Sequence, residues 1–199
     1  ENPINPETHF QTMSEIASAL DQKVDYIFIS TSTCGTLMGC ARYVFENKLP
    51  TKIIAVDAIG SVTFGQEENV RLIPGHGSGK PSNFLNLNFI NNAIYISDEE
   101  CIRGCWKLLE NEAILCGGSS GAVISAIEKY ASAIPAGANC VGILPDRGEH
   151  YLDTVYNKTW IKKHFPDFEF SKRPVNTEVT IKRKGRPRKS FKTLTISST

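Results

Sequence analysis

Short apolar segments that alternate with amphipathic ones constrain the fold of this sequence more than any other feature. The run KVDYIFIS, residues 23–30, is rich in β-branched and aromatic residues, which is typical of a short buried strand. In the segment that follows, residues 35–49, apolar residues recur at helical spacing, at Leu37, Cys40, Ala41 and Val44. The sequence therefore predicts a strand, a tight loop and a helix in succession.

The same succession recurs along most of the chain. Strands are expected at residues 23–30, 52–59, 93–97 and 140–145, and helices at residues 7–21 and 35–49, from Ser97 or Asp98 onward, and at residues 122–134. Strands separated by helices predict an α/β fold, in which a mostly parallel sheet carries helices on both faces. In such sheets ligands bind at the carboxyl ends of the strands.

Charge divides the 199-residue chain into two parts. Residues 166–199 contain nine Lys or Arg and three acids, whereas the rest has an excess of acids. We therefore predict an α/β domain at residues 1–165 and a basic, flexible tail at residues 166–199. No apolar run reaches the roughly 20 residues that span a bilayer, and the first ten residues are polar, so we expect a cytosolic protein.

The basic stretch KRKGRPRK, Lys182 to Lys189, resembles an AT-hook, whose arginines enter the minor groove of A·T-rich DNA. The alternative is a solvated tail, which we favour because short basic runs recur by chance. A non-catalytic binding module with a DNA-binding tail stays open as a function of another class. Otherwise neither nucleic acid nor a membrane is expected as a partner.

The six cysteines lie in apolar or helical segments, so we expect reduced thiols. Cys101 and Cys105 share one face of an expected helix and could begin a metal site. A tetrahedral site needs further ligands, and no second close pair supplies them. We therefore predict no metal site.

Two small-residue loops are candidates for ligand binding. The loop Ser32-Thr33-Cys34-Gly35-Thr36 offers backbone N–H groups and hydroxyls at a helix start, which favours a phosphate, although a merely capped helix start stays open. The loop CGGSSGA, residues 116–122, allows close approach of a flat ligand, or it is a glycine turn with Ser119 or Ser120 as the N-cap. Because both loops are expected at the edge of the sheet where ligands bind, we predict that they share one site.

Five motifs in order give the sequence a family resemblance. They are STCGT, IIAVDAIGS, LPGHG, DEECIRGCWKLLENEAILCGGSSGAV and ILPDRGEHYL. Residues 2–164 resemble the C-terminal half of the cysteine synthase and cystathionine β-synthase family, which are pyridoxal-phosphate enzymes of fold type II, the fold of the tryptophan synthase β subunit. Within the family, VDAIGSVTFG, LPDRGEHYLDTVYNKTW and the serine-led loop resemble the N-(2-amino-2-carboxyethyl)-L-glutamate synthases of 2,3-diaminopropionate and siderophore biosynthesis.

The resemblance implies roles for individual residues. The phosphate cup would be Ser32, Thr33, Cys34, Gly35 and Thr36, with Ser32 and Cys34 in place of glycines. Ser119 would contact the pyridine nitrogen of pyridoxal 5'-phosphate, and its neutral hydroxyl would favour β-elimination over transamination. Substrate contacts would come from Ser32, Gly75, His76 and Asp146, and Asp57 and Ser61 would line the side of the second substrate. For His76 an exposed loop position is the alternative, and for Asp146 a surface pair with Arg147.

The resemblance also implies a reaction. An O-activated L-serine, which we expect to be O-phospho-L-serine, would lose its leaving group to give an aminoacrylate, to which the amine of L-glutamate adds. The alternative is a cysteine synthase or cystathionine β-synthase, with sulfide or homocysteine as the nucleophile. Members of the family are usually homodimers, so the resemblance implies a homodimer for the full-length enzyme.

In the family, the lysine that forms the Schiff base precedes the region that begins at Glu1. None of the lysines here stands in the expected motif, and Lys80 is expected to be a solvated loop lysine. We therefore expect that this chain lacks the Schiff-base lysine and is inactive alone.

Overall fold

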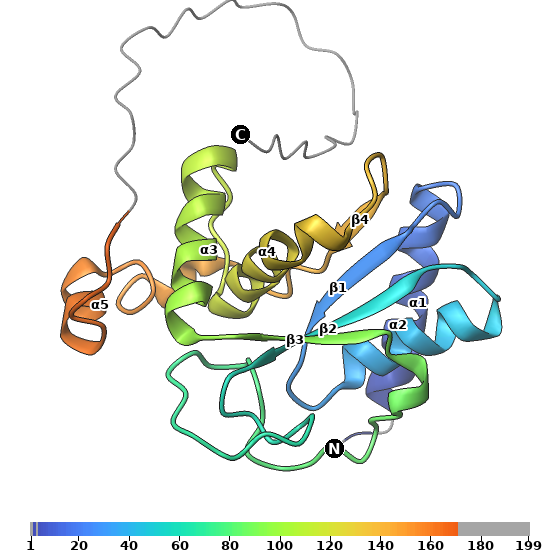
Figure 1. Cartoon of the computed structure of the whole chain (residues 1–199), viewed down its shortest axis with the longest axis horizontal. Coiled ribbons are helices and arrows are strands. Elements are labelled where there is room, and N and C mark those ends of the chain that lie inside the picture. The colour runs from blue at the N-terminus through green and yellow to red at the C-terminus, as the bar shows by residue number, and fades with distance from the viewer. Residues whose placement is uncertain (1, 3, 171–199) are drawn as a thin grey trace, which may run out of the picture. The chain divides into compact units, whose positions relative to one another are not determined.

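The computed structural model describes residue 2 and residues 4–170. Its centre is a parallel sheet of four strands in the order β3-β2-β1-β4 (Figure 1). The strands are β1 (Tyr26–Ser30), β2 (Lys52–Ala58), β3 (Asn92–Ile96) and β4 (Cys140–Gly142). Each lies within a segment whose composition predicted a strand, apart from one residue at the start of β3.

Helices cover both faces of this sheet (Figure 1). Helices α1 (Ile4–Ala19) and α2 (Gly35–Glu46) pack on each other on one side, and α3 (Asp98–Glu112) and α4 (Gly118–Tyr130) pack on each other on the other side. A short helix, α5 (Lys158–His164), follows β4. The predicted parallel α/β fold is therefore confirmed.

The strands are buried because both faces of the sheet are covered. In β1 the four residues from Tyr26 to Ile29 are buried, and in β2 only the first residue, Lys52, is exposed. Continuous apolar runs of this kind are typical of parallel strands, whereas strands with one solvated face alternate. Register brings Ile27 beside Ile53 and Ile29 beside Ala55, so the core is continuous across the two central strands.

Helix α3 begins with a capping box, which its sequence SDEE predicts. The Ser97 hydroxyl accepts a hydrogen bond from the backbone N–H of Glu100 (3.2 Å), and Glu100 Oε2 accepts one from the backbone N–H of Ser97 (2.8 Å). These bonds satisfy two N–H groups that have no partner within a helix. The predicted start of this helix is confirmed.

A long irregular segment joins β2 to β3, as its lack of periodicity predicts. Arg71 holds it together, because its guanidinium donates to the carbonyls of Gly60 and of Ser78 (3.2 Å to the latter). The segment ends in a short 3₁₀ helix, Leu87–Phe89.

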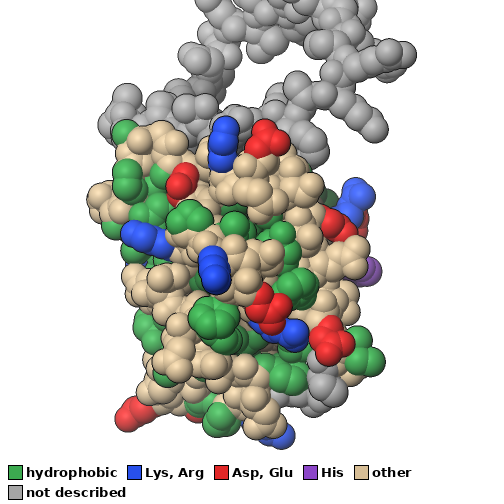
Figure 2. All heavy atoms as spheres, turned by 90° about the vertical axis from the view of Figure 1, so that its right-hand side faces the viewer, with side chains coloured by type: hydrophobic (Ala, Val, Ile, Leu, Met, Phe, Trp, Pro, Cys, Tyr) green, Lys and Arg blue, Asp and Glu red, His purple; other side chains and the backbone are tan. Residues whose placement is uncertain are grey.

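Figure 2 shows the face on the right of Figure 1, where apolar side chains are interspersed with charges of both signs.

The first compact unit of the chain comprises residues 1–169. Its end is fixed by Phe168, which is buried and whose ring lies 4.5 Å from the Arg103 guanidinium carbon. The second unit comprises residues 170–199, and the predicted AT-hook-like stretch, Lys182 to Lys189, lies outside the described residues. Among the helices that the structure describes, none combines the length and apolarity needed to cross a bilayer. All six cysteines are free thiols.

Candidate functional site

A cavity of about 220 Å³ opens at the carboxyl end of the sheet. From β1 the chain passes through α2 to β2, which pairs with one edge of β1. Strand β4 pairs with the opposite edge of β1, so the order of the strands reverses between β1 and β4. Such a switch point is where open α/β sheets bind ligands. The lining residues are Ser30, Ser32, Thr33, Cys34, Gly35, Thr36, Pro74, Gly75, Ser119, Pro145, Asp146 and Tyr151.

The first predicted loop forms one part of this lining. Cys34 is the N-cap of α2 and has a φ of 64°, a left-handed conformation, and its side chain makes no capping hydrogen bond. The first N–H groups of α2, beginning at Gly35, therefore have neither an intrahelical acceptor nor a cap from Cys34. The loop is also anchored, because Ser82 Oγ donates to the Thr33 carbonyl (2.7 Å). The arrangement offers a helix N-terminus and two threonine hydroxyls to an anion.

The second predicted loop contributes Ser119 from the first turn of α4. The two glycines before it lie against side chains: a Cβ at Gly117 would overlap the Asp146 carboxylate, and a Cβ at Gly118 would overlap Ile73. The glycines therefore let α4 begin close to the end of β4. Thr36 and Ser119, from separate elements, line the same cavity, as the prediction of one shared site requires.

Asp146 and Tyr151 form a hydrogen-bonded pair in the lining. The Tyr151 hydroxyl donates to Asp146 Oδ2 (2.5 Å), and this bond to a carboxylate raises the pKa of Tyr151 to about 12. Asp146 Oδ1 is buried and has no hydrogen-bond partner among the described residues. The alternative of a surface pair with Arg147 is wrong, because Arg147 pairs with Glu149 (2.9 Å).

Two of the other expected substrate contacts lie in the loop that follows Ile73. Gly75 lines the cavity and has a φ of 73°. His76 does not line the cavity, and the alternative of an exposed histidine is wrong, because only 2 % of its surface is exposed. Burial lowers the pKa of His76 to about 4, and neither ring nitrogen has a partner among the described residues.

Asp57 and Ser61, expected beside the second substrate, are fully buried and lie outside the cavity lining. The Thr31 hydroxyl donates to Asp57 Oδ1 (2.8 Å), and burial raises the pKa of Asp57. Ser61 Oγ accepts from the backbone N–H of Ser78 (2.9 Å). These residues therefore hold the ends of β1 and β2 and the neighbouring loop together. Lys80 in that loop is exposed.

Sequence reasoning missed four lining residues: Ser30, Pro74, Pro145 and Tyr151. Two of them adjoin residues that it did name, since Pro74 precedes Gly75 and Pro145 precedes Asp146. Ser30 lies two residues before Ser32. Tyr151 is the last residue of a 3₁₀ helix, Gly148–Tyr151, and carries no periodic signal. Its motif, ILPDRGEHYL, was the signal that could have identified it.

The described residues contain no cluster of His, Cys, Asp or Glu that could hold a metal ion.

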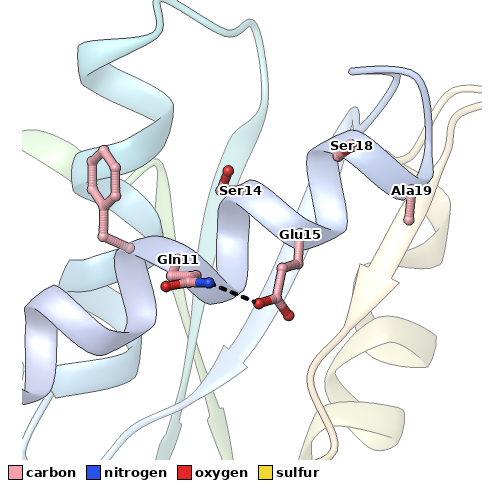
Figure 3. A pocket seen from close by; sticks show the side chains of 6 residues that line it. Gln11, Ser14, Glu15, Ser18 and Ala19 are labelled. Carbon is pink, nitrogen blue, oxygen red and sulfur yellow. Dashed lines mark hydrogen bonds between the residues drawn. The ribbon is translucent and has the colours of Figure 1, made fainter.

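A second hollow of about 630 Å³ runs along the outer face of α1 (Figure 3). There Gln11 Nε2 donates to Glu15 Oε1 (3.3 Å), beside Ser14 and Ser18. It is open and lies away from the carboxyl ends of the strands, so the cavity beside β1 and β4 is the better candidate for chemistry.

Comparison with known proteins identifies the family. A family model described as pyridoxal-phosphate dependent enzyme matches residues 1–146. The chain belongs to this family. Its members bind pyridoxal 5'-phosphate.

Three solved structures of the family share the fold. The chain is 31 % identical to an O-acetylserine dependent cystathionine β-synthase from Helicobacter pylori (TM-score 0.72, 79 % of this chain and 52 % of that one). It is 33 % identical to a cysteine synthase from Entamoeba histolytica (TM-score 0.74, 78 % and 47 %) and 25 % identical to an O-ureido-L-serine synthase (TM-score 0.72, 77 % and 50 %). The chain spans about half the length of each of these structures.

The cavity fits the family's cofactor. Its volume of about 220 Å³ is well above the space that one water molecule needs, so the cavity admits a small organic ligand. The N-terminus of α2 and the hydroxyls of Thr33 and Thr36 supply donors for a phosphate, and glycine at 117 and 118 leaves room beside Ser119. Asp146, whose Oδ1 is buried and has no donor among the described residues, belongs to the same lining.

Proposed function

We propose that this chain binds the phosphate and ring of pyridoxal 5'-phosphate as part of a β-replacement enzyme. The observation that carries the proposal is that Thr36 of α2 and Ser119 of α4 line one cavity at the switch point of the sheet. The neighbouring solved structures, a cystathionine β-synthase and a cysteine synthase among them, support the reaction class. When bound, the cofactor supplies an electron sink for chemistry at the amino-acid substrate.

The residues of this chain have separate tasks in the proposal. The backbone N–H groups at the start of α2 and the Thr33 and Thr36 hydroxyls bind the phosphate and fix the position of the ring. The Ser119 hydroxyl hydrogen-bonds the ring nitrogen. The anchored loop, held through Ser82 and Thr33, keeps these donors in place before the ligand arrives.

For the finer reaction we propose O-phospho-L-serine and L-glutamate as substrates, with N-(2-amino-2-carboxyethyl)-L-glutamate as the product. The support is the motif resemblance together with Ser32, which lines the cavity where the family cup has glycine. Its hydroxyl adds a polar contact for a nucleophile larger than sulfide. Sulfide or homocysteine is the second candidate nucleophile, since two of the similar structures are a cysteine synthase and a cystathionine β-synthase.

Ligand binding tests the cofactor site directly. The probe is 4'-deoxypyridoxine 5'-phosphate, which keeps the phosphate and the ring but has no aldehyde to react with lysines. We expect saturable binding by calorimetry, and a loss of about tenfold in affinity for Thr36→Val, because one hydrogen bond to a charged group is removed. Thr8→Val, on the exposed part of α1, is the matched control. Absence of binding to the folded chain would contradict the proposal.

The full-length protein that contains this chain tests the substrates. O-phospho-L-serine is offered with L-glutamate, sulfide or homocysteine, and products are identified by mass spectrometry. We expect the glutamate adduct, and for Ser32→Gly a shift of the kcat/KM ratio towards sulfide. Consumption of sulfide or homocysteine alone would replace the glutamate proposal by its alternative, and an unchanged preference in Ser32→Gly would remove the role of Ser32.

A further inference from the structure

Two cysteines that the proposed function does not use lie side by side next to the cavity wall. Cys105 belongs to α3 and Cys116 precedes α4, and both side chains are buried. The Cys105 thiol donates to the carbonyl of Gly117, the residue after Cys116 (3.3 Å), and the two thiols are in hydrogen-bonding contact. Their sulfurs are therefore adjacent, as formation of a disulfide requires.

Both cysteines are held in place by their neighbours. The Cys116 N–H donates to Tyr156 Oη (3.1 Å), and this hydroxyl donates to the Cys116 carbonyl (2.6 Å). Tyr156 Oη also lies 4.0 Å from Cys116 Sγ. On the other side Cys105 packs against Gly121 of α4, where a Cβ would overlap Cys105 Sγ. The surrounding structure therefore keeps the two thiols next to each other.

The two thiols differ in their readiness to ionise. Hydrogen bonding from Cys105 lowers the pKa of Cys116, whereas hydrogen bonding to Cys116 and burial raise the pKa of Cys105. A thiolate, not a thiol, is the nucleophile that reacts with an oxidant. Cys116 is therefore the thiol that reacts first, and Cys105 is the one that completes the disulfide.

We propose that Cys105 and Cys116 form a reversible disulfide with a peroxide as the oxidant, and that this bond weakens ligand binding in the cavity. Transient disulfides of this kind act as redox sensors in reducing compartments. The bond itself does not depend on the proposed function, whereas its effect on the ligand rests on it.

The reaction with hydrogen peroxide balances in two steps. The Cys116 thiolate attacks one oxygen, the O–O bond breaks, and hydroxide leaves and takes up a proton to become water, which leaves a sulfenic acid. The Cys105 sulfur then attacks the Cys116 sulfur, the S–O bond breaks, and the second hydroxide leaves as water with the Cys105 proton. The two thiols lose two electrons, and one peroxide becomes two waters.

Access of the oxidant depends on the segment that carries Cys116. Its backbone forms one isolated bridge with Arg147, whose side chain is 85 % exposed. A short bridge near the surface opens locally at a much lower free energy than a core helix does. Hydrogen peroxide is little larger than water, so a brief opening is enough to admit it.

The disulfide would act on the cavity through the loop that carries Ser119. Bonded sulfurs lie about 2 Å apart, closer than sulfurs in hydrogen-bonding contact, so Cys116 has to move towards α3. The reaction also consumes the proton that Cys105 donates to the Gly117 carbonyl. Since Ser119 lies two residues beyond Gly117 and lines the cavity, we expect its hydroxyl to move away from the ligand.

Close packing is the competing explanation for the pair. A buried cysteine also behaves as a small apolar side chain, and the contact of Gly104 with Gly121 leaves little room between α3 and α4. This explanation predicts that a peroxide oxidises the exposed Cys140 and leaves Cys105 and Cys116 as thiols.

Peptide mapping tests the disulfide directly. The whole chain is treated with hydrogen peroxide, the remaining thiols are alkylated, and the protein is digested with trypsin in the absence of reductant. Cleavage after Arg103, Lys107 and Lys129 separates the cysteines of this region. We expect peptides 104–107 and 108–129, which contain one cysteine each, to be joined, and dithiothreitol to part them.

Calorimetry with 4'-deoxypyridoxine 5'-phosphate measures the effect on the cavity after the peroxide is removed. The oxidised parent should bind about tenfold more weakly than the reduced parent, the loss of one hydrogen bond, and dithiothreitol should restore the affinity. Cys105→Ser keeps a donor for the Gly117 carbonyl, so it should bind like the reduced parent and not respond to peroxide. Cys140→Ser, at an exposed cysteine, is the matched control and should respond as the parent does.

The outcomes separate the disulfide from the proposed function. Absence of the joined peptides, or a bond from Cys101 to either thiol instead, would overturn the inference. A joined protein that binds the ligand as tightly as the reduced one would overturn it too, because the bond would then not act on the cavity. Failure of the reduced, folded parent to bind would overturn the proposed function and the effect on the ligand together, and the peptide map would still decide on the disulfide.

A second variant guards against a change that only prevents folding. Cys116→Ser removes the thiol that reacts first, and circular dichroism checks its fold and that of Cys105→Ser. Whichever variant folds should show no joined peptides and no response to peroxide. A response that persists in a folded variant would contradict the assignment to this pair.

Discussion

Gly104 of α3 and Gly121 of α4 lie in direct backbone contact, so close that a Cβ at Gly104 would overlap the Gly121 carbonyl. A Cβ at Gly121 would overlap the Cys101 carbonyl in the same way. The pair lets the two helices approach until their backbones touch. Since Ser119 is in the first turn of α4, this contact also sets the position of one wall of the cavity.

Gly104→Ala should therefore lower the free energy of unfolding by about 2 to 3 kcal/mol, the cost of overpacking a core. Urea denaturation followed by circular dichroism measures it. Gly79→Ala is the matched control, because a Cβ there would meet only the flexible end of Glu68, and its effect should stay below about 1 kcal/mol. Equal effects at the two positions would contradict the helix contact.

Removal of the capping box should destabilise the start of α3. Ser97→Ala deletes the acceptor for the Glu100 N–H and should lower the free energy of unfolding by about 1 kcal/mol. Ser97→Asp retains a side-chain acceptor and should recover most of the loss. If the aspartate variant is as unstable as the alanine variant, the cap is not the cause.

The left-handed backbone at Cys34 should make glycine more stabilising than alanine at this position, which is the reverse of their usual order in a helix. With φ at 64°, a Cβ is unfavourable, so Cys34→Gly should be about 1 kcal/mol more stable than Cys34→Ala. Both variants lose the thiol, so the comparison isolates the backbone. At Gln11, in the exposed part of α1, the order should be the normal one, with alanine more stable than glycine by about 1 kcal/mol. The same order at both positions would contradict the assignment of strain to Cys34.

Buried His76 should make stability depend on pH. Its pKa is about 4 in the folded chain and 6.5 when unfolded, so between these values the unfolded chain binds a proton that the folded chain does not. The free energy of unfolding should therefore fall by about 3 kcal/mol as the pH is lowered from 6.5 to 4.

In His76→Leu this component should be absent. Stability at pH 7 should be retained, since leucine removes two buried nitrogens that have no hydrogen-bond partner in the described part of the chain. Urea titrations at several pH values give the difference between the two proteins. Asp57, whose pKa burial raises, contributes with the opposite sign near pH 4, and the difference cancels it because both proteins contain it. Parallel pH profiles would refute the assignment to His76.

Local signals predicted the elements of this fold well. The apolar runs around Ile27 and Ile54 gave the central strands, and the acidic first turn after Ser97 gave the start of α3. The two small-residue loops were recognisable because glycine and hydroxyl residues stand directly at the start of a helix. These signals lie within a few residues of the feature that they specify.

Features that depend on distant contacts were not predictable in this way. His76 lies between two glycines in a polar loop, so nothing nearby indicates that it is buried. Tyr151 becomes part of the site only because β4 and the turn after it carry Asp146 to the end of β1. The strand order that brings these segments together has no signature in any one segment.

The pairing of β4 with β1 sets the moment at which the cavity can first exist. In sequence, 114 residues separate Asp25 from Asn139, which meet at the start of these two strands. During synthesis on the ribosome, the loop Ser32 to Thr36 at the start of α2 would emerge long before Asp146. Ligand binding should then require synthesis of the chain at least as far as Asp146, and shorter nascent chains should not bind the ligand.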